Sequence, residues 1–252
     1  AFLYSESLIL VVTGHTLSHS YSDLTEVVDM DSSTSCLQLP TYPFKMSGAS
    51  GGVINGSPMV CGGYNYNNNA PKDESSCYSH DKELNIWKQH AIMNHARDVP
   101  ASVVLDKSLW VTGGWGGSRL KSTEFVRGDG TVTMGPDLPT ARSGHCMVTL
   151  HDGKVMIIGG YPTSRDVLVF DQSNSEFTTG PSTLEKRSYI ACTIFNSPLH
   201  GNRPIVLAAG GYDVSVRAEI FDYTITNEWQ TSMYFLMFLK QEFLFLQCTA
   251  IA

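Results

Sequence analysis

Charged side chains are scarce in this sequence. Only 16% of its 252 residues are charged, and 24 acidic against 17 basic residues leave a net charge of −7 with neutral histidines. Because 42% of the residues are hydrophobic, the chain is too apolar and too weakly charged to be intrinsically disordered. Its acidic balance predicts no nucleic-acid partner, and its length allows one large all-β domain.

Cysteine and the compact motifs of catalysis are also sparse. The six cysteines contain no C-x-x-C pair, which excludes the spacing of a zinc knuckle or a thioredoxin-like site. The eight histidines form no H-E-x-x-H motif, and neither a P-loop nor a G-x-S-x-G nucleophile elbow occurs. We therefore expect no enzyme activity, no cofactor and no metal site.

A long uninterrupted apolar run is missing as well. Residues 233–252 are rich in large apolar side chains, but Lys240, Gln241 and Glu242 lie at the centre of this segment. Because a charge at a helix centre costs roughly 2.5–3.5 kcal/mol on insertion, we predict no stable membrane span. The segment is then an atypical hydrophobic tail, a closing strand, or an aberrant end of a chain that we expect to be a fragment.

Glycine, in contrast, is abundant and regularly placed. Four Gly-Gly pairs end apolar runs, in the segments PMVCGG, LWVTGG, VMIIGG and VLAAGG, and ILVVTG is a degenerate fifth copy. The last glycines recur at intervals of about 50 residues, the period of one class of repeat protein. These glycines are Gly14, Gly63, Gly114, Gly160 and Gly211.

Other residues recur in register with the glycines. A basic residue precedes each Gly-Gly pair, and a short apolar strand such as LVFD or EIFD follows it. The basic residues are Lys45, Arg97, Arg142 and Arg187. This order divides residues 1–232 into units of about 7–44, 45–96, 97–141, 142–186 and 187–232. Such short strands cannot bury both faces alone, so neighbouring units must stack.

The layout resembles the kelch repeat family over residues 8–232. The resemblance implies an all-β, kelch-type β-propeller in which each unit forms one four-stranded blade. We expect about five recognisable blades in an incomplete ring. The first unit begins at its second strand, so its first strand must come from elsewhere, and residues 242–252 could supply it by closing a five-blade ring.

The resemblance also implies a binding face made of loops at one end of the propeller. An aromatic residue directly follows each Gly-Gly pair, and aromatic residues beside arginine commonly anchor interfaces. The basic column either holds backbone carbonyls and acidic side chains or presents donors on this face. The candidate contact residues are Tyr64, Arg97, Trp115, Arg119, Arg142, Tyr161, Arg165, Arg187, Tyr212 and Arg217. Phe170, Phe177, Phe221 and Trp229 are instead expected between blades.

Two cysteines occupy positions that favour a cross-strand pair. Cys61 and Cys77 lie in the second and third strands of one unit and can form a disulfide in an oxidising compartment, with Cys36 as an alternative partner. Cys146 and Cys192 are offset by one position in the repeat, and we expect them not to pair. The early cysteines and the sequon at Asn55 lean slightly toward a secreted protein, with a cytoplasmic one as the alternative.

The sequence thus predicts a non-enzymatic scaffold that binds an unknown protein partner. One alternative is a propeller enzyme of the metal oxidase or sugar-processing type. Another is the substrate-recognition part of a cullin-type ubiquitin ligase adaptor that lacks its helical domains.

Overall fold

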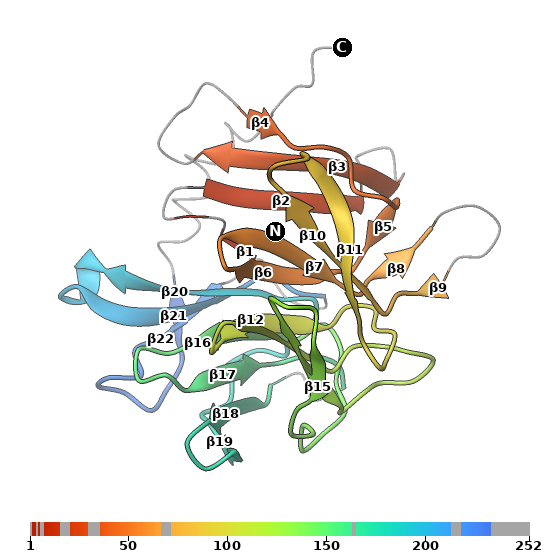
Figure 1. Cartoon of the computed structure of the whole chain (residues 1–252). Helices are drawn as coiled ribbons and strands as arrows, with labels where there is room; N and C mark the ends of the chain where they lie inside the picture. Colours follow the sequence, from red (N-terminus) through yellow and green to blue (C-terminus); the bar gives the residue numbers. More distant parts are fainter. Residues whose placement is uncertain are drawn as a thin grey trace. The chain divides into compact units, whose positions relative to one another are not determined.

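The computed structural model describes residues 2–3, 5, 8–15, 21–29, 36–66, 72–162, 165–212 and 218–232. Its contacts divide the chain into two compact units, one containing the described residues up to Asp137 and the other those from Leu138 onward. Within the described residues, five four-stranded antiparallel sheets and one three-stranded sheet are present (Figure 1).

The first unit contains blades 1 to 3. Blade 1 consists of β1 (Phe2–Leu3), β2 (Leu8–His15), β3 (Tyr21–Asp29) and β4 (Cys36–Gln38). Blade 2 consists of β6 (Ser50–Ile54), β7 (Ser57–Cys61), β10 (Ser76–Asp81) and β11 (Ile86–Ile92). Blade 3 consists of β12 (Ala101–Leu105), β13 (Ser108–Thr112), β14 (Thr123–Arg127) and β15 (Val132–Met134).

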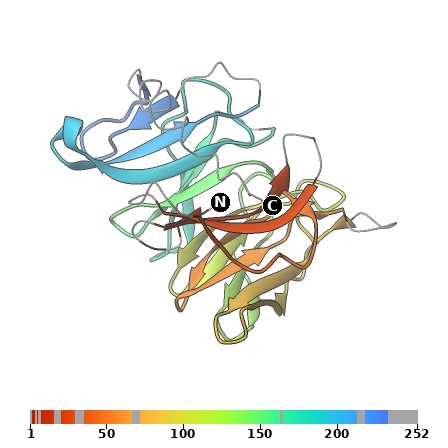
Figure 2. The same ribbon diagram turned by 90° about the horizontal axis from the view of Figure 1, so that it is seen from above.

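The second unit contains blades 4 and 5. Blade 4 consists of β16 (Cys146–Thr149), β17 (Val155–Ile158), β18 (Val167–Asp171) and β19 (Glu176–Thr179). Blade 5 consists of β20 (Ala191–Ser197), β21 (Arg203–Ala209), β22 (Ala218–Phe221) and β23 (Gln230–Ser232). A short 3-10 helix, η1 (Pro198–His200), lies in the β20–β21 hairpin, which Figure 2 shows in cyan and light blue.

Two details differ from the sequence prediction. The first strand of blade 1 is β1, in which Phe2 pairs with Leu10 of β2. This strand is therefore formed by the residues that directly precede β2 in the sequence, and not by ring closure. The segment after Gly63, where the resemblance places a loop of the binding face, contributes β8 (Tyr64–Asn65) and β9 (Lys72–Asp73). In the three-stranded sheet β8 pairs with β9 and with β5 (Met46–Ser47). Residues 233–252 lie outside the described residues, so the role predicted for them stays a prediction.

The core of each unit lies between neighbouring blades. Side chains of blades 4 and 5 form one apolar cluster that includes Met156, Val206 and Trp229. The indole N–H of Trp229 donates to the Pro181 carbonyl oxygen at 2.9 Å, and Trp87 makes the matching bond to Pro40 at 3.0 Å. A buried indole therefore combines a large apolar surface with a satisfied donor, as the stacking of blades requires.

The Gly-Gly pairs permit close approach between consecutive blades. Gly62 has a φ of +69°, and a Cβ atom there would lie 2.5 Å from the Arg97 carbonyl oxygen of blade 3. The next residue, Gly63, donates its N–H to that same oxygen at 2.7 Å. In the second unit, Gly160 makes the matching bond to Arg187 at 2.8 Å. Any larger side chain at Gly62 would separate the two blades.

Candidate functional site

Three of the predicted contact residues lie in the interior. Arg97, Arg142 and Arg187 precede β12, β16 and β20, and each is 0% exposed. Their side chains therefore cannot present donors on a binding face, which was one of the two predicted uses of the basic column. Each guanidinium instead donates from Nη1 to the carbonyl oxygen of the first glycine of its own Gly-Gly pair. The distances are 2.7 Å to Gly113, 3.0 Å to Gly159 and 2.8 Å to Gly210.

In blades 3 and 5 the arginine also meets a buried carboxylate. Arg97 Nη2 lies 2.9 Å from Glu124 Oε1, and Arg187 Nη2 lies 2.8 Å from Glu219 Oε1. Burial opposes ionisation of Glu124, but the backbone N–H of Asn94 and the Arg97 guanidinium together hold its pKa below the ordinary value. Burial lowers the pKa of Arg97, and Glu124 opposes this shift. The Arg97–Glu124 pair is thus ionised, and charge-assisted hydrogen bonds support both pairs.

The exposed part of the site lies beside these arginines. The residue after each arginine forms a β-bridge with the aromatic residue after Gly-Gly: Asp98 with Trp115, Ser143 with Tyr161, and Ser188 with Tyr212. Trp115 is 40% exposed, Tyr161 51% and Tyr212 69%. The repeat therefore places three of the four predicted aromatic residues at the surface, on a backbone fixed by the buried arginines.

Tyr64, the fourth predicted aromatic residue, has different surroundings. It is half-buried in β8, opposite Ser47, and its ring packs edge-on against Tyr66 at a centroid distance of 4.8 Å. In blade 2 the residue after Gly-Gly belongs to the three-stranded sheet, whereas in blades 3 to 5 it forms an isolated β-bridge. Tyr64 is therefore less accessible to a partner than Trp115, Tyr161 or Tyr212.

Tyr189 belongs with the exposed aromatic residues of the second unit, although the repeat pattern did not identify it. It is 61% exposed, its φ is +55°, and its N–H donates to the Gly144 carbonyl oxygen at 2.7 Å. A Cβ atom at Gly144 would lie 3.4 Å from Tyr189 Cγ, so the ring lies close to that glycine. One sequence signal could have identified Tyr189: it is an aromatic residue at a repeat position that Gly48 and Gly144 occupy in blades 2 and 4. We call Tyr161, Tyr189 and Tyr212 the tyrosine face.

The remaining predicted arginines divide between the units. The Arg119 guanidinium lies 5.6 Å from the Trp115 ring centroid in blade 3, a cation–π arrangement. Arg165 is exposed in the second unit and donates from Nε to the Thr183 carbonyl oxygen at 2.8 Å. Arg217 lies outside the described residues.

The cysteines form two disulfides in the described part of the chain. Cys61 and Cys77 are directly opposite each other in β7 and β10, with Cα atoms 4.1 Å apart, and are joined. Cys146 and Cys192, expected not to pair, are also joined, with Cα atoms 6.0 Å apart. That expectation was wrong because the two cysteines lie on different blades. Stacked blades turn opposite faces toward each other, so the one-residue offset brings the two side chains together.

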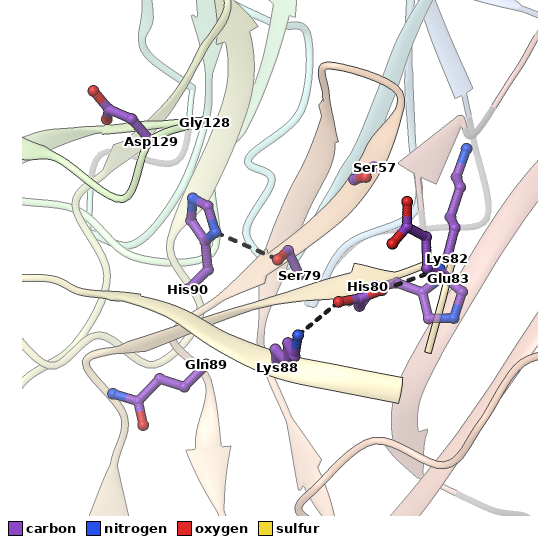
Figure 3. A pocket seen from close by; sticks show the side chains of 11 residues that line it. Ser57, Ser79, His80, Lys82, Glu83, Lys88, Gln89, His90, Gly128 and Asp129 are labelled. Carbon is purple, nitrogen blue, oxygen red and sulfur yellow. Dashed lines mark hydrogen bonds and ion pairs between the residues drawn. The ribbon is translucent and has the colours of Figure 1, made fainter. Parts of the chain in front are cut away.

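A hollow polar surface lies on the first unit, between blades 2 and 3. It is a cavity of about 560 Å³ lined by polar side chains of blade 2 and by the β14–β15 turn of blade 3, including Ser79, His90 and Asp129 (Figure 3). Among the residues that the structure describes, no cluster of three metal-ligating side chains is present. No helix in the described ranges is long and apolar enough to cross a membrane.

The comparisons with known proteins agree with the repeat pattern. No family model matches the chain. It is 28% identical over 105 residues to the kelch repeat-containing protein kel-10 of Caenorhabditis elegans, covering 39% of this chain and 18% of that protein. It is 31% identical over 83 residues to the spermatocyte protein spe-26 of the same organism, covering 32% and 14%. The chain thus spans less than a fifth of either relative.

A solved structure extends the likeness to most of the fold. The structure of YjhT superposes with a TM-score of 0.69 at 13% sequence identity, covering 82% of this chain and 70% of that one. At this identity the match bears on the fold alone. The repeat pattern, the four-stranded blades and these matches together confirm the predicted resemblance to the kelch repeat family and the predicted β-propeller fold.

Proposed function

We propose that this chain is a protein-binding module and that its tyrosine face contacts the partner by binding alone, without catalysing a reaction at that face. The observation that carries the proposal is the exposure of Tyr161, Tyr189 and Tyr212 on segments of the second unit that β-bridges and a backbone hydrogen bond join to one another. Tyrosine supplies a large contact area and a hydroxyl group while losing little side-chain entropy, and it is enriched among residues that dominate binding energy.

The backbone beneath the tyrosine face supports this function. Ser143 and Ser188 form β-bridges with Tyr161 and Tyr212, and each serine directly follows a fully buried arginine. Contact residues on a fixed backbone need little ordering when they bind, which favours affinity. In the first unit the exposed ring of Trp115 forms a cation–π pair with Arg119, and these two residues are candidate contacts there.

The experiment compares the wild-type chain with the triple variant Tyr161→Ala, Tyr189→Gly, Tyr212→Ala. Proteins captured by the wild type are identified by mass spectrometry, and the affinity of the most enriched one is measured by calorimetry. We expect at least a tenfold loss of affinity, about 1.4 kcal/mol. The control is Leu199→Ala, which removes a side chain that is 72% exposed elsewhere on the second unit. Unchanged affinity in the triple variant, or an equal loss in the control, would refute the proposal.

A further inference from the structure

Ser79 and His90 lie on one face of blade 2, beside the polar cavity of the first unit. Ser79 pairs with Lys88 across β10 and β11. The pairing register shifts at His90, and the His90 ring lies on the Ser79 side of the sheet, with Nδ1 3.4 Å from Ser79 Oγ, so the two side chains share a face. That face is turned toward blade 3, because the His90 ring bonds to the carbonyl oxygen of Arg127 there. Figure 3 shows the Ser79 and His90 side chains directed at each other within the cavity.

The hydrogen bonds of His90 assign its tautomer. His90 Nε2 lies 3.0 Å from the Arg127 carbonyl oxygen, which can only accept, so Nε2 carries the proton. In the neutral ring Nδ1 then has a free lone pair, and it lies 3.4 Å from Ser79 Oγ. The serine hydroxyl therefore donates to the histidine. A nucleophile, a base and a group that orients the base are arranged in series, as in enzymes that activate a serine.

We propose that Ser79 is a nucleophile activated by His90, and that the cavity accepts small acyl esters whose acyl group is transferred to Ser79. The cavity of about 560 Å³ falls within the roughly 300–1,000 Å³ typical of small-molecule sites. The Cys61–Cys77 disulfide joins β7 and β10 in the same blade, which restrains the strand that carries Ser79. This site is separate from the tyrosine face and does not rest on the proposed binding function.

The step balances with the groups present. Ser79 Oγ gives its proton to His90 Nδ1 and forms a bond to the carbonyl carbon of the ester. The bond from that carbon to the leaving oxygen then breaks, and the proton on Nδ1 passes to that oxygen or to water. Lys88 lies across the strand pair from Ser79, half exposed, with its ammonium 2.7 Å from Asp81 Oδ2. Its positive charge favours the negative charge that develops on the carbonyl oxygen.

The test uses p-nitrophenyl acetate and a fluorophosphonate probe on the full chain. We expect release of about one equivalent of nitrophenolate per chain and an acetyl ester on Ser79, located by mass spectrometry. Ser79→Ala removes the label at this position, and His90→Gln slows its formation at least tenfold, in keeping with the typical gain from a general base. The controls are Ser118→Ala and His151→Gln, exposed residues outside the cavity, which we expect to label like the wild type.

Two results would overturn the proposal. One is labelling of Ser79 at the same rate in His90→Gln as in the wild type, because the histidine would then not act as a base. The other is a label confined to lysine amines such as Lys88, or no label at all, in wild-type protein that melts cooperatively. Treatment with hydroxylamine distinguishes an acetyl ester on Ser79 from an acetyl amide on lysine, because it removes the serine ester and leaves the lysine amide intact. Binding at the tyrosine face is unaffected by either result.

Discussion

Blades 4 and 5 of the second unit contain the same buried arginine in two different settings. Arg187 of blade 5 bonds to Glu219, which also accepts the backbone N–H groups of Leu184 at 2.7 Å and Glu185 at 3.0 Å. In blade 4 the position of the glutamate is occupied by Leu168. Within the described residues Arg142 Nε has no hydrogen-bond partner. Burial lowers the pKa of the Arg142 guanidinium, and the negative charge of exposed Asp166 only partly opposes this shift.

The difference shows which interaction the repeat requires. Blade 3 has the same arrangement as blade 5, because Arg97 pairs with Glu124. All three arginines nevertheless donate to the carbonyl oxygen of the first glycine of their Gly-Gly pair. In blade 5 Leu184, three residues before the arginine, donates its N–H to the glutamate. The corresponding residue of blade 4 is Pro139, which has no backbone N–H. Blade 4 has thus lost the carboxylate together with one of its backbone donors. The shared role of the arginine is to satisfy the glycine carbonyl, and the carboxylate is an addition made in two blades.

The largest effect is expected when blade 5 is converted to the blade 4 arrangement. Glu219→Leu leaves Arg187 as a buried charge without its carboxylate and frees two backbone N–H groups. Breaking such a pair costs about 3–5 kcal/mol of unfolding free energy. Urea unfolding measures the loss, with Glu176→Leu, at an exposed carboxylate of blade 4, as the control. A loss no larger than that of the control would show that the pair contributes little.

The disulfide between these two blades gives the next largest effect. The double variant Cys146→Ala, Cys192→Ala removes a bridge that closes a loop with a sequence separation of 46 residues. We expect it to lose about 2–4 kcal/mol against the oxidised wild type. Urea unfolding with and without dithiothreitol provides the check, because wild type and variant should converge once the bridge is reduced. A difference that persists in reductant would assign the loss to packing of the cysteine side chains.

Arg142→Met tests the arginine of blade 4, which has no glutamate partner. The substitution removes the desolvation cost of a buried charge and leaves the Gly159 carbonyl without its donor, so the two effects oppose each other. We expect a change of about 1 kcal/mol or less. The same substitution at Arg187 leaves Glu219 buried without its guanidinium partner, and should cost several times more in the same urea experiment. Equal losses at the two positions would mean that the carboxylate does not distinguish the blades.

The fold was largely predictable from the sequence because each blade repeats the same local signals. Gly-Gly pairs ended the second strands, and the aromatic positions identified packing between blades, as Trp229 shows. What escaped prediction depends on contacts between separate segments. The Cys146–Cys192 bridge needs two stacked faces, and the Ser79–His90 pair needs the blade 3 turn that brings the Arg127 carbonyl to the imidazole. Tyr189 required a positive φ that its residue type disfavours.

A pH-dependent effect concerns Asp98, which stands where blades 4 and 5 have Ser143 and Ser188. Burial, with a smaller contribution from Asp73, raises the pKa of the Asp98 carboxyl to about 6, although the Val99 N–H opposes the shift. The folded chain therefore favours protonated Asp98. Between about pH 4 and pH 6 the folded state binds more protons at this group than the unfolded state, so the contribution of Asp98 to stability falls as pH rises.

Replacing this carboxyl by the serine of the other blades should remove that pH dependence. We expect Asp98→Ser to gain stability relative to the wild type at pH 7 and to lose most of this gain at pH 4, where the folded wild type already holds Asp98 protonated. Serine at this position keeps the β-bridge to the aromatic residue after Gly-Gly in blades 4 and 5, so we expect the bridge to Trp115 to persist. Thermal melting at the two pH values measures the difference. Parallel shifts at both would show that Asp98 does not titrate between them, and that the charge at this position is compensated in the folded chain.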